Sequence, residues 1–241
     1  MSKQRRNVVV NLIAFIFLLG ASVVFSRDGN TLNDGQIMPI FMPAGYAFSI
    51  WSLIYLLLGI WIIKGVNPSE NEQKMYKNVG YWLAAALVFS ALTIIVPLEW
   101  TVGMILLALV TALVAYQKVD KSASNRIYRI PYSLLVGWLS VATIVNISLV
   151  LKSKGITEIF GIGEVGWAII MLAVGAILAI FFSVSKDDNL YPLVFVWGYI
   201  GIAVRNAEIP SIVRMALIAS GLLIVLVTYN LVSQFFEREK D

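Results

Sequence analysis

The chain has 241 residues, of which 59% are hydrophobic and 13% are charged, and its formal net charge is +4. A soluble domain could not cover that much apolar side chain with so little polar surface, so most of the chain is expected to lie in lipid. The sequence contains no His and no Cys, which excludes a Ser-His triad, imidazole or thiolate metal ligands and disulfides.

Apolar blocks follow one another along the chain, separated by short polar stretches. They cover residues 8–25, 47–64, 79–97, 100–117, 131–151, 165–184, 190–204 and 212–234. A helix needs roughly 20 residues to cross a hydrocarbon core of about 30 Å. We therefore predict an all-α, polytopic membrane bundle of about eight transmembrane helices. The seventh block is the shortest, and if it does not cross the membrane the C-terminus changes sides.

The first block is interpreted as a retained helix, because Ser26-Arg27-Asp28 after it is a poor signal-peptide cleavage site. Cytoplasmic loops of membrane proteins accumulate Lys and Arg. With eight spans, 13 of the 18 Lys and Arg residues lie on the side of both termini. The sequence therefore predicts a protein of the cell membrane with its N- and C-termini in the cytoplasm. The basic residues do not gather on one arm, so no nucleic-acid partner is expected.

Residues 26–46 form the longest predicted connection and contain several Gly and Pro residues. A loop of that length in a compact membrane protein is commonly a lid or a binding element. The centres of the apolar blocks contain no Asp, Glu, Lys or Arg, and proton-coupled transporters usually need such groups in the membrane. Neither proton coupling nor a conventional active site is indicated, and no catalytic residue, metal ligand or resident cofactor is predicted.

Polar and aromatic side chains inside the apolar blocks are the remaining candidates. They are Tyr55, Ser90, Thr93, Trp138, Ser140, Thr143, Asn146, Trp197 and Tyr199. Hydrogen bonding between helices is the expected role for any one of them. Asn146 is the strongest individual candidate, because an amide near the middle of a helix needs a partner in another helix, in water or in a ligand.

Two stretches carry a more specific pattern. Residues 43–55 are Pro-Ala-Gly-Tyr-Ala-Phe-Ser-Ile-Trp-Ser-Leu-Ile-Tyr, and residues 138–146 are Trp-Leu-Ser-Val-Ala-Thr-Ile-Val-Asn with Pro131-Tyr132 upstream. They resemble the loop into helix two and the fifth helix of the TspO/MBR family, the translocator or tryptophan-rich sensory proteins. Ala44 and Tyr46 replace a Pro and a Trp of the family pattern, and the last three predicted helices have no counterpart in it.

The resemblance implies two regions, a TspO-like five-helix bundle over residues 1–152 and an added three-helix region over 153–241. It also implies a pocket among the first five helices, capped by the loop at 26–46, that binds tetrapyrroles such as porphyrin or sterol-like molecules. The ligand contacts that it assigns are Pro43, Tyr46, Phe48, Trp51, Tyr55, Trp138, Ala142 and Asn146. A flat aromatic ligand would stack on Trp and Tyr, and one amide could orient it.

The leading hypothesis is thus a membrane ligand-binding or sensory protein that is not an enzyme. A transporter of porphyrin or another apolar metabolite is the first alternative, and a light-dependent porphyrin-degrading enzyme that uses a Trp is the second. A scaffold whose pocket is filled by side chains is the third. The expected partners are membrane lipid and a small apolar or tetrapyrrole ligand, and the resemblance allows a homodimer.

Overall fold

The computed structural model describes residues 3–25, 38–123 and 125–238. The chain forms two compact units. Unit 1 comprises Met1–Ile37 and Ile50–Val150, and unit 2 comprises Met38–Ser49 and Leu151–Asp241. Of the loop predicted at 26–46, residues 26–37 lie outside the described part of the chain. The remainder of that loop belongs to unit 2.

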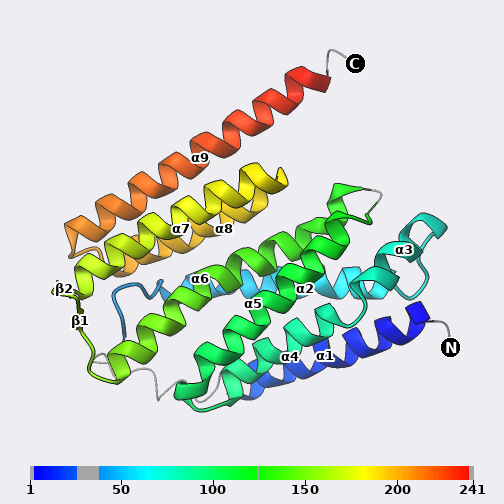
Figure 1. Cartoon of the computed structure of the whole chain (residues 1–241), viewed down its shortest axis with the longest axis horizontal. Coiled ribbons are helices and arrows are strands. Elements are labelled where there is room, and N and C mark those ends of the chain that lie inside the picture. Colours follow the sequence, from blue (N-terminus) through cyan, green and yellow to red (C-terminus); the bar gives the residue numbers. More distant parts are fainter. Residues whose placement is uncertain (1–2, 26–37, 124, 239–241) are drawn as a thin grey trace. The chain divides into compact units, whose positions relative to one another are not determined.

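Unit 1 is built from the N-terminal helices (Figure 1). Its elements are α1 (Lys3–Phe25), α2 (Ile50–Lys64), α3 (Glu70–Val79), α4 (Trp82–Ile95), α5 (Leu98–Asp120), the 3-10 turn η3 (Arg126–Arg129) and most of α6 (Ile130–Ser153). Helix α4 packs against both α1 and α5. Helix α6 meets α2 through Tyr132, whose ring stands edge-on to that of Trp61 with centroids 5.2 Å apart.

Helix α1 buries mainly small and polar residues and exposes large apolar ones. Its buried face recurs every three or four positions, which is one side of a helix. That face consists of Gln4, Asn7, Val8, Asn11, Ala14, Leu18 and Ala21. On the opposite side, Ile13 is 62% and Ile16 is 60% exposed. This arrangement is the reverse of a soluble amphipathic helix and is the one that a lipid solvent favours.

The third apolar block, residues 79–97, begins at a break between two helices. Helix α3 ends at Val79, Gly80 adopts a φ of 57°, and α4 begins at Trp82. The two helix axes differ by 47°. Asn11 of α1 bridges the break, because its Oδ1 accepts from the Ala84 backbone N–H at 2.9 Å and its Nδ2 donates to the Gly80 carbonyl at 3.3 Å. A side chain of α1 thus caps the first turn of α4.

Helix α3 is amphipathic and begins with a capping box formed by Ser69 and Glu72. The Ser69 backbone N–H donates to the Glu72 carboxylate at 2.8 Å. The buried face of α3 carries Met75, Tyr76 and Val79. The sequence predicts a polar connection here, so this helix is an addition to the expected elements.

Unit 2 holds the C-terminal helices together with the segment that precedes α2 (Figure 1). Its elements are the 3-10 turn η2 (Gly45–Ser49), the end of α6, the strands β1 (Glu158–Ile159) and β2 (Ile162–Gly163), and the helices α7 (Glu164–Lys186), α8 (Leu190–Arg205) and α9 (Pro210–Arg238). Each of the three helices packs against the other two. The two short strands pair in an antiparallel hairpin.

The number of membrane spans is lower than the sequence predicts. Among the described residues, six helices are long and apolar enough to cross a membrane, and the bent pair α3–α4 makes a seventh if it counts as one span. Helix α8 has 16 residues, which is about 24 Å and short of a core of about 30 Å. The all-α polytopic class is confirmed, and the structure supports six to seven spans in place of eight.

Candidate functional site

Two of the predicted ligand contacts, Trp51 and Tyr55, meet on one face of α2, as their spacing of four residues requires. Their rings are stacked, with centroids 5.4 Å apart and planes at 28°. Helix α1 supports the pair, since Ser22 Oγ lies 2.9 Å from the Tyr55 hydroxyl and Phe15 stands edge-on to the Tyr55 ring. Both rings are half-buried, so part of each ring surface can be reached by a ligand.

Asn146 and Ala142 also lie together, on α6. The Asn146 amide donates to the Ala142 carbonyl at 2.9 Å. The sequence leads us to expect a partner in another helix, in water or in a ligand, but a carbonyl one turn back satisfies this donor with its second lone pair. Asn146 is half-buried, and its amide oxygen can still accept a bond from a ligand.

Trp138 lies on the same face of α6, at spacings of four and eight residues from Ala142 and Asn146. Its side chain is only 1% exposed, and all residues from 131 to 139 are buried. A ligand can stack on Trp138 only if the surrounding helices move. In this structure Trp138 is a core side chain.

The other three predicted contacts, Pro43, Tyr46 and Phe48, belong to unit 2, whereas Trp51 belongs to unit 1. The Tyr46 ring stands edge-on to Trp197 of α8, with centroids 5.5 Å apart. Tyr46 is 44% and Phe48 is 40% exposed. The cap predicted over the first five helices stays a prediction, because what the structure describes of this segment is its attachment to α7 and α8.

The segment before α2, Met38–Ser49, is held at its start by hydrogen bonds to its backbone. The Ile40 N–H donates to the Glu164 carboxylate at 2.8 Å, and the Ile40 carbonyl accepts from the Asn206 amide at 2.9 Å. Glu164 also pairs with Lys152, whose Nζ lies 2.9 and 3.0 Å from its two carboxylate oxygens. One carboxylate of α7 therefore orders both the segment and the end of α6.

The middle of the segment lies directly on the backbone of α8 at Gly201. The Ala44 N–H donates to the Gly201 carbonyl at 2.9 Å. A Cβ atom at Gly201 would lie 2.9 Å from the Ala47 Cβ and 3.1 Å from the Pro43 Cβ, so only glycine permits this approach. The Trp197 indole N–H adds a bond to the Ala47 carbonyl at 2.8 Å. The aromatic tip of the segment is thus rigidly presented by unit 2.

The remaining polar candidates divide into two groups. Four hydroxyl groups bond the carbonyl one turn back in their own helix, namely those of Ser90, Thr93, Ser140 and Thr143. Such bonds satisfy a hydroxyl in lipid without joining helices. Tyr199 instead bonds across helices, because its hydroxyl donates to the Leu172 carbonyl of α7 at 2.8 Å. Interhelical bonding is therefore confirmed for Tyr199 but not for the four hydroxyls.

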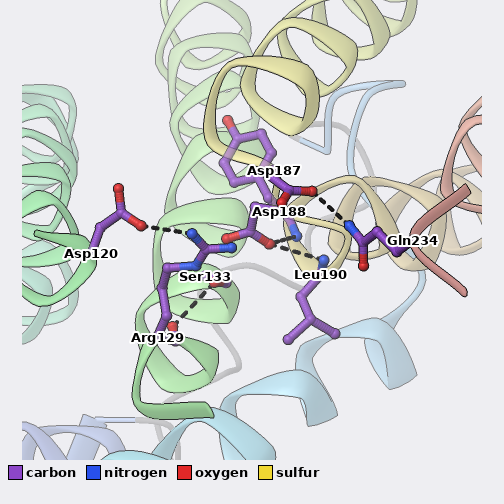
Figure 2. A network of polar contacts seen from close by, with 8 residues as sticks. Asp120, Arg129, Ser133, Asp187, Asp188, Leu190 and Gln234 are labelled. Carbon is purple, nitrogen blue, oxygen red and sulfur yellow. Dashed lines mark hydrogen bonds and ion pairs between the residues drawn. The ribbon is translucent and has the colours of Figure 1, made fainter. Parts of the chain in front are cut away.

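A buried cation lies at the junction of α5 and α6, where the sequence predicts a solvated loop. Arg129 is 7% exposed, and its Nη1 lies 2.6 Å from Asp120 Oδ1 (Figure 2). Its guanidinium also lies over the Tyr116 ring, 5.7 Å from the centroid. The Ser133 hydroxyl donates to the Arg129 carbonyl at 3.1 Å. These contacts hold the turn η3 against α5 and serve the fold of unit 1.

In unit 2, the turn between α7 and α8 carries two carboxylates. Asp188 is buried and accepts from the backbone N–H groups of Leu190 and Tyr191 at 3.0 and 3.2 Å, so it caps α8 (Figure 2). Asp187 adopts a φ of 48° and accepts from the Gln234 amide of α9 at 2.7 Å. Within the described residues, no group of three His, Cys, Asp or Glu side chains could hold a metal ion.

The chain was compared with models of known protein families. A family model described as TSPO-like protein matches residues 7–229. The resemblance that the sequence indicates at residues 43–55 and 138–146 is confirmed by this match. The match also extends beyond residue 152, through α7 and α8 and into α9. The sequence motifs alone indicate no counterpart of these helices in the family. No curated protein and no solved structure matches the chain.

Proposed function

This chain belongs to the TSPO-like protein family and is a multi-pass integral membrane protein, and from that premise we propose that it is a receptor for a flat, apolar ligand. The ligand is a tetrapyrrole such as porphyrin or a molecule of sterol-like shape, and the protein binds it without transforming it. The observation that carries this proposal is the stacked, half-buried pair of Trp51 and Tyr55.

The pair suits such a ligand because it is held in place before the ligand arrives. The bond between Ser22 and Tyr55 restricts the phenol ring, and a preorganised surface loses less entropy when a ligand binds. An aromatic contact contributes about 0.5 to 1.5 kcal/mol beyond the burial of its area. We propose that Trp51 and Tyr55 stack on the ligand and that Asn146 orients a polar edge.

Replacing Trp51 by Leu is expected to weaken porphyrin binding roughly 10-fold, because about 1.4 kcal/mol of stacking corresponds to that factor. The measurement is a titration of purified protein in detergent with protoporphyrin, followed by the shift of the porphyrin absorbance band. This signal does not depend on the tryptophans. Asn146→Leu is expected to weaken binding by a smaller factor, since it removes one polar contact.

The matched control is Trp100→Leu, which removes another tryptophan of unit 1 that is 66% exposed at the start of α5. It should leave the titration unchanged. If the parent protein gives no saturable shift, the receptor proposal is wrong. If Trp100→Leu and Trp51→Leu weaken binding equally, the porphyrin binds nonspecifically and the assignment to Trp51 fails.

Two further measurements separate binding from its alternatives. Sealed vesicles that contain the protein should bind porphyrin to saturation without accumulating it inside, whereas a transporter would give accumulation. Illumination of the complex should leave the porphyrin absorbance intact. A loss of absorbance that Trp138→Phe abolishes would instead support light-dependent breakdown.

We also propose that the protein lies in the cell membrane with both termini in the cytoplasm, which requires an even number of crossings. If the bent pair α3–α4 is the seventh span, the short helix α8 must also cross. The excess of Lys and Arg on the terminal side supports this orientation. A fluorescent protein fused after Asp241 should be fluorescent, and an alkaline phosphatase fused there should be inactive, because phosphatase folds only outside the cytoplasm. An active phosphatase would mean an odd number of crossings, so that either α8 or the bent pair α3–α4 does not cross.

A further inference from the structure

The hairpin before α7 has an unusual turn. Register pairs Ile159 with Ile162, so the two turn residues are Phe160 and Gly161. Both have positive φ, 55° and 75°, which is the type I′ geometry of a two-residue hairpin. The first of these positions normally holds Asn, Asp or Gly, because a bulky side chain is strained in the left-handed region. Phe160 is therefore a poor choice for the turn itself.

The Phe160 side chain is also unusually exposed to solvent. Phe160 is 92% exposed, a larger fraction than for any other large apolar side chain among the described residues. A ring in that position gains nothing from burial within its own chain. The turn thus combines backbone strain with the loss of hydrophobic burial, and strain of this sort persists where a function requires it.

The hairpin is fixed to the first turn of α7. The Trp167 indole N–H donates to the Ile159 carbonyl at 3.1 Å. A Cβ atom at Gly166 would lie 2.6 Å from Ile162 Cγ2, so Ile162 packs directly on the helix backbone. These contacts present Phe160 on a rigid support.

The position of α7 sets the environment of the tip. Helix α7 has 23 residues and is apolar enough to span the membrane, and at about 1.5 Å per residue it is about 35 Å long. Glu164 at its start therefore lies near the edge of a hydrocarbon core of about 30 Å, and the headgroup layer beyond is about 6 Å thick. Two strand residues reach about 7 Å, which places the tip within or at the edge of that layer.

We propose that Phe160 inserts into the headgroup layer of the leaflet in which α7 begins and anchors this end of unit 2 to lipid. Trp167 supports the choice of lipid as the partner, because it ties the hairpin to the helix and an indole is itself favoured at this level of the membrane. The anchor is independent of the ligand-binding function proposed above.

The test uses the absence of cysteine from the chain. Phe160→Cys is labelled with a polarity-sensitive fluorophore in phosphatidylcholine vesicles, and Asn71→Cys, an exposed position of the polar helix α3, is the control. Lipids that carry a quencher near the headgroup should quench the label at 160 several-fold more than the label at 71. Aqueous iodide should give the opposite order. Equal access of iodide to both labels would overturn the proposal. Binding of a partner protein to the tip would not rescue it, because the proposal names lipid as the partner.

A second measurement needs no cysteine and so does not depend on the folding of a labelled variant. The unmodified protein is irradiated in vesicles with a phosphatidylcholine that carries a photoreactive group near the headgroup, and then cleaved after glutamate. Adducts should appear on the peptide from 159 to 164. Phe160→Asn suits the turn and should keep the fold but reduce these adducts several-fold. An unmodified peptide in the parent protein, or equal adducts in the variant, would contradict the insertion.

Discussion

Gly175→Ala is expected to destabilise unit 2 by about 1 to 3 kcal/mol, the usual cost of an extra methyl group in a packed core. A Cβ atom at this position of α7 would lie 2.3 Å from the Tyr199 hydroxyl oxygen and 3.1 Å from Phe195 Cε1. Tyr199 and Phe195 are both fully buried, so neither ring can swing into open space. Helix α8 must therefore move away from α7.

The steric clash is the larger effect of this substitution. The bond from Tyr199 to the Leu172 carbonyl is worth about 0.6 kcal/mol in a membrane protein, so Tyr199→Phe alone should have a small effect. In the Tyr199→Phe background, Gly175→Ala should cost less, because the atom nearest to the new methyl group is absent. Thermal unfolding in detergent, followed by circular dichroism, measures all three variants.

The control is Gly221→Ala in α9, where an added Cβ meets no atom within 4 Å. Alanine there should be neutral or stabilising by up to about 1 kcal/mol, since glycine is a poor helix former. If Gly175→Ala were as stable as Gly221→Ala, the close packing of α7 on α8 would be wrong.

The helices of this protein could be predicted from hydropathy, because each apolar block had to satisfy its backbone within a helix in lipid. The break at Gly80 and the helix before it could not be predicted in this way. Residues 70–78 are mostly polar, and the group that stabilises the break, Asn11, is distant in sequence. The capping box of Ser69 and Glu72 was a readable local signal for α3, but the surrounding polar residues favoured a loop.

The candidate site shows the same division between local and distant contacts. The stacking of Trp51 on Tyr55 follows from a spacing of four residues on a helix. The attachment of Pro43 and its neighbours to Gly201 could not be predicted, because it depends on the absence of a side chain far along the sequence. The burial of Trp138 likewise could not be predicted, because it depends on how other helices pack around α6 and not on the sequence of α6 itself.

Asn11→Leu is expected to destabilise unit 1 by about 1 to 3 kcal/mol, which is the cost of leaving a buried polar group without its partner. Asn11 is 2% exposed and serves two backbone groups, the Ala84 N–H and the Gly80 carbonyl. Leucine has a similar volume but can bond neither group. The first turn of α4 would lose its cap at the point where the chain bends, and Ala84 should then exchange its amide hydrogen faster.

Asn7 provides a matched comparison, one turn earlier on the same buried face of α1. It is 1% exposed, and neither its Nδ2 nor its Oδ1 has a hydrogen-bond partner among the described residues. Removing a polar group that makes no bond leaves no partner unsatisfied, so Asn7→Leu should be neutral or stabilising. The gain in helix propensity from Asn to Leu is the same at both positions, so it cancels in the comparison.

The difference between the two variants therefore isolates the bridge that Asn11 makes across the break between α3 and α4. Thermal unfolding of both proteins in the same detergent gives that difference, and amide exchange at residues 80–84 locates it. If Asn7→Leu and Asn11→Leu were equally destabilising, the cost would come from the loss of polarity along α1, and the bend would need another cause. A loss confined to Asn11→Leu would mean that one side chain of the first helix stabilises the break between α3 and α4.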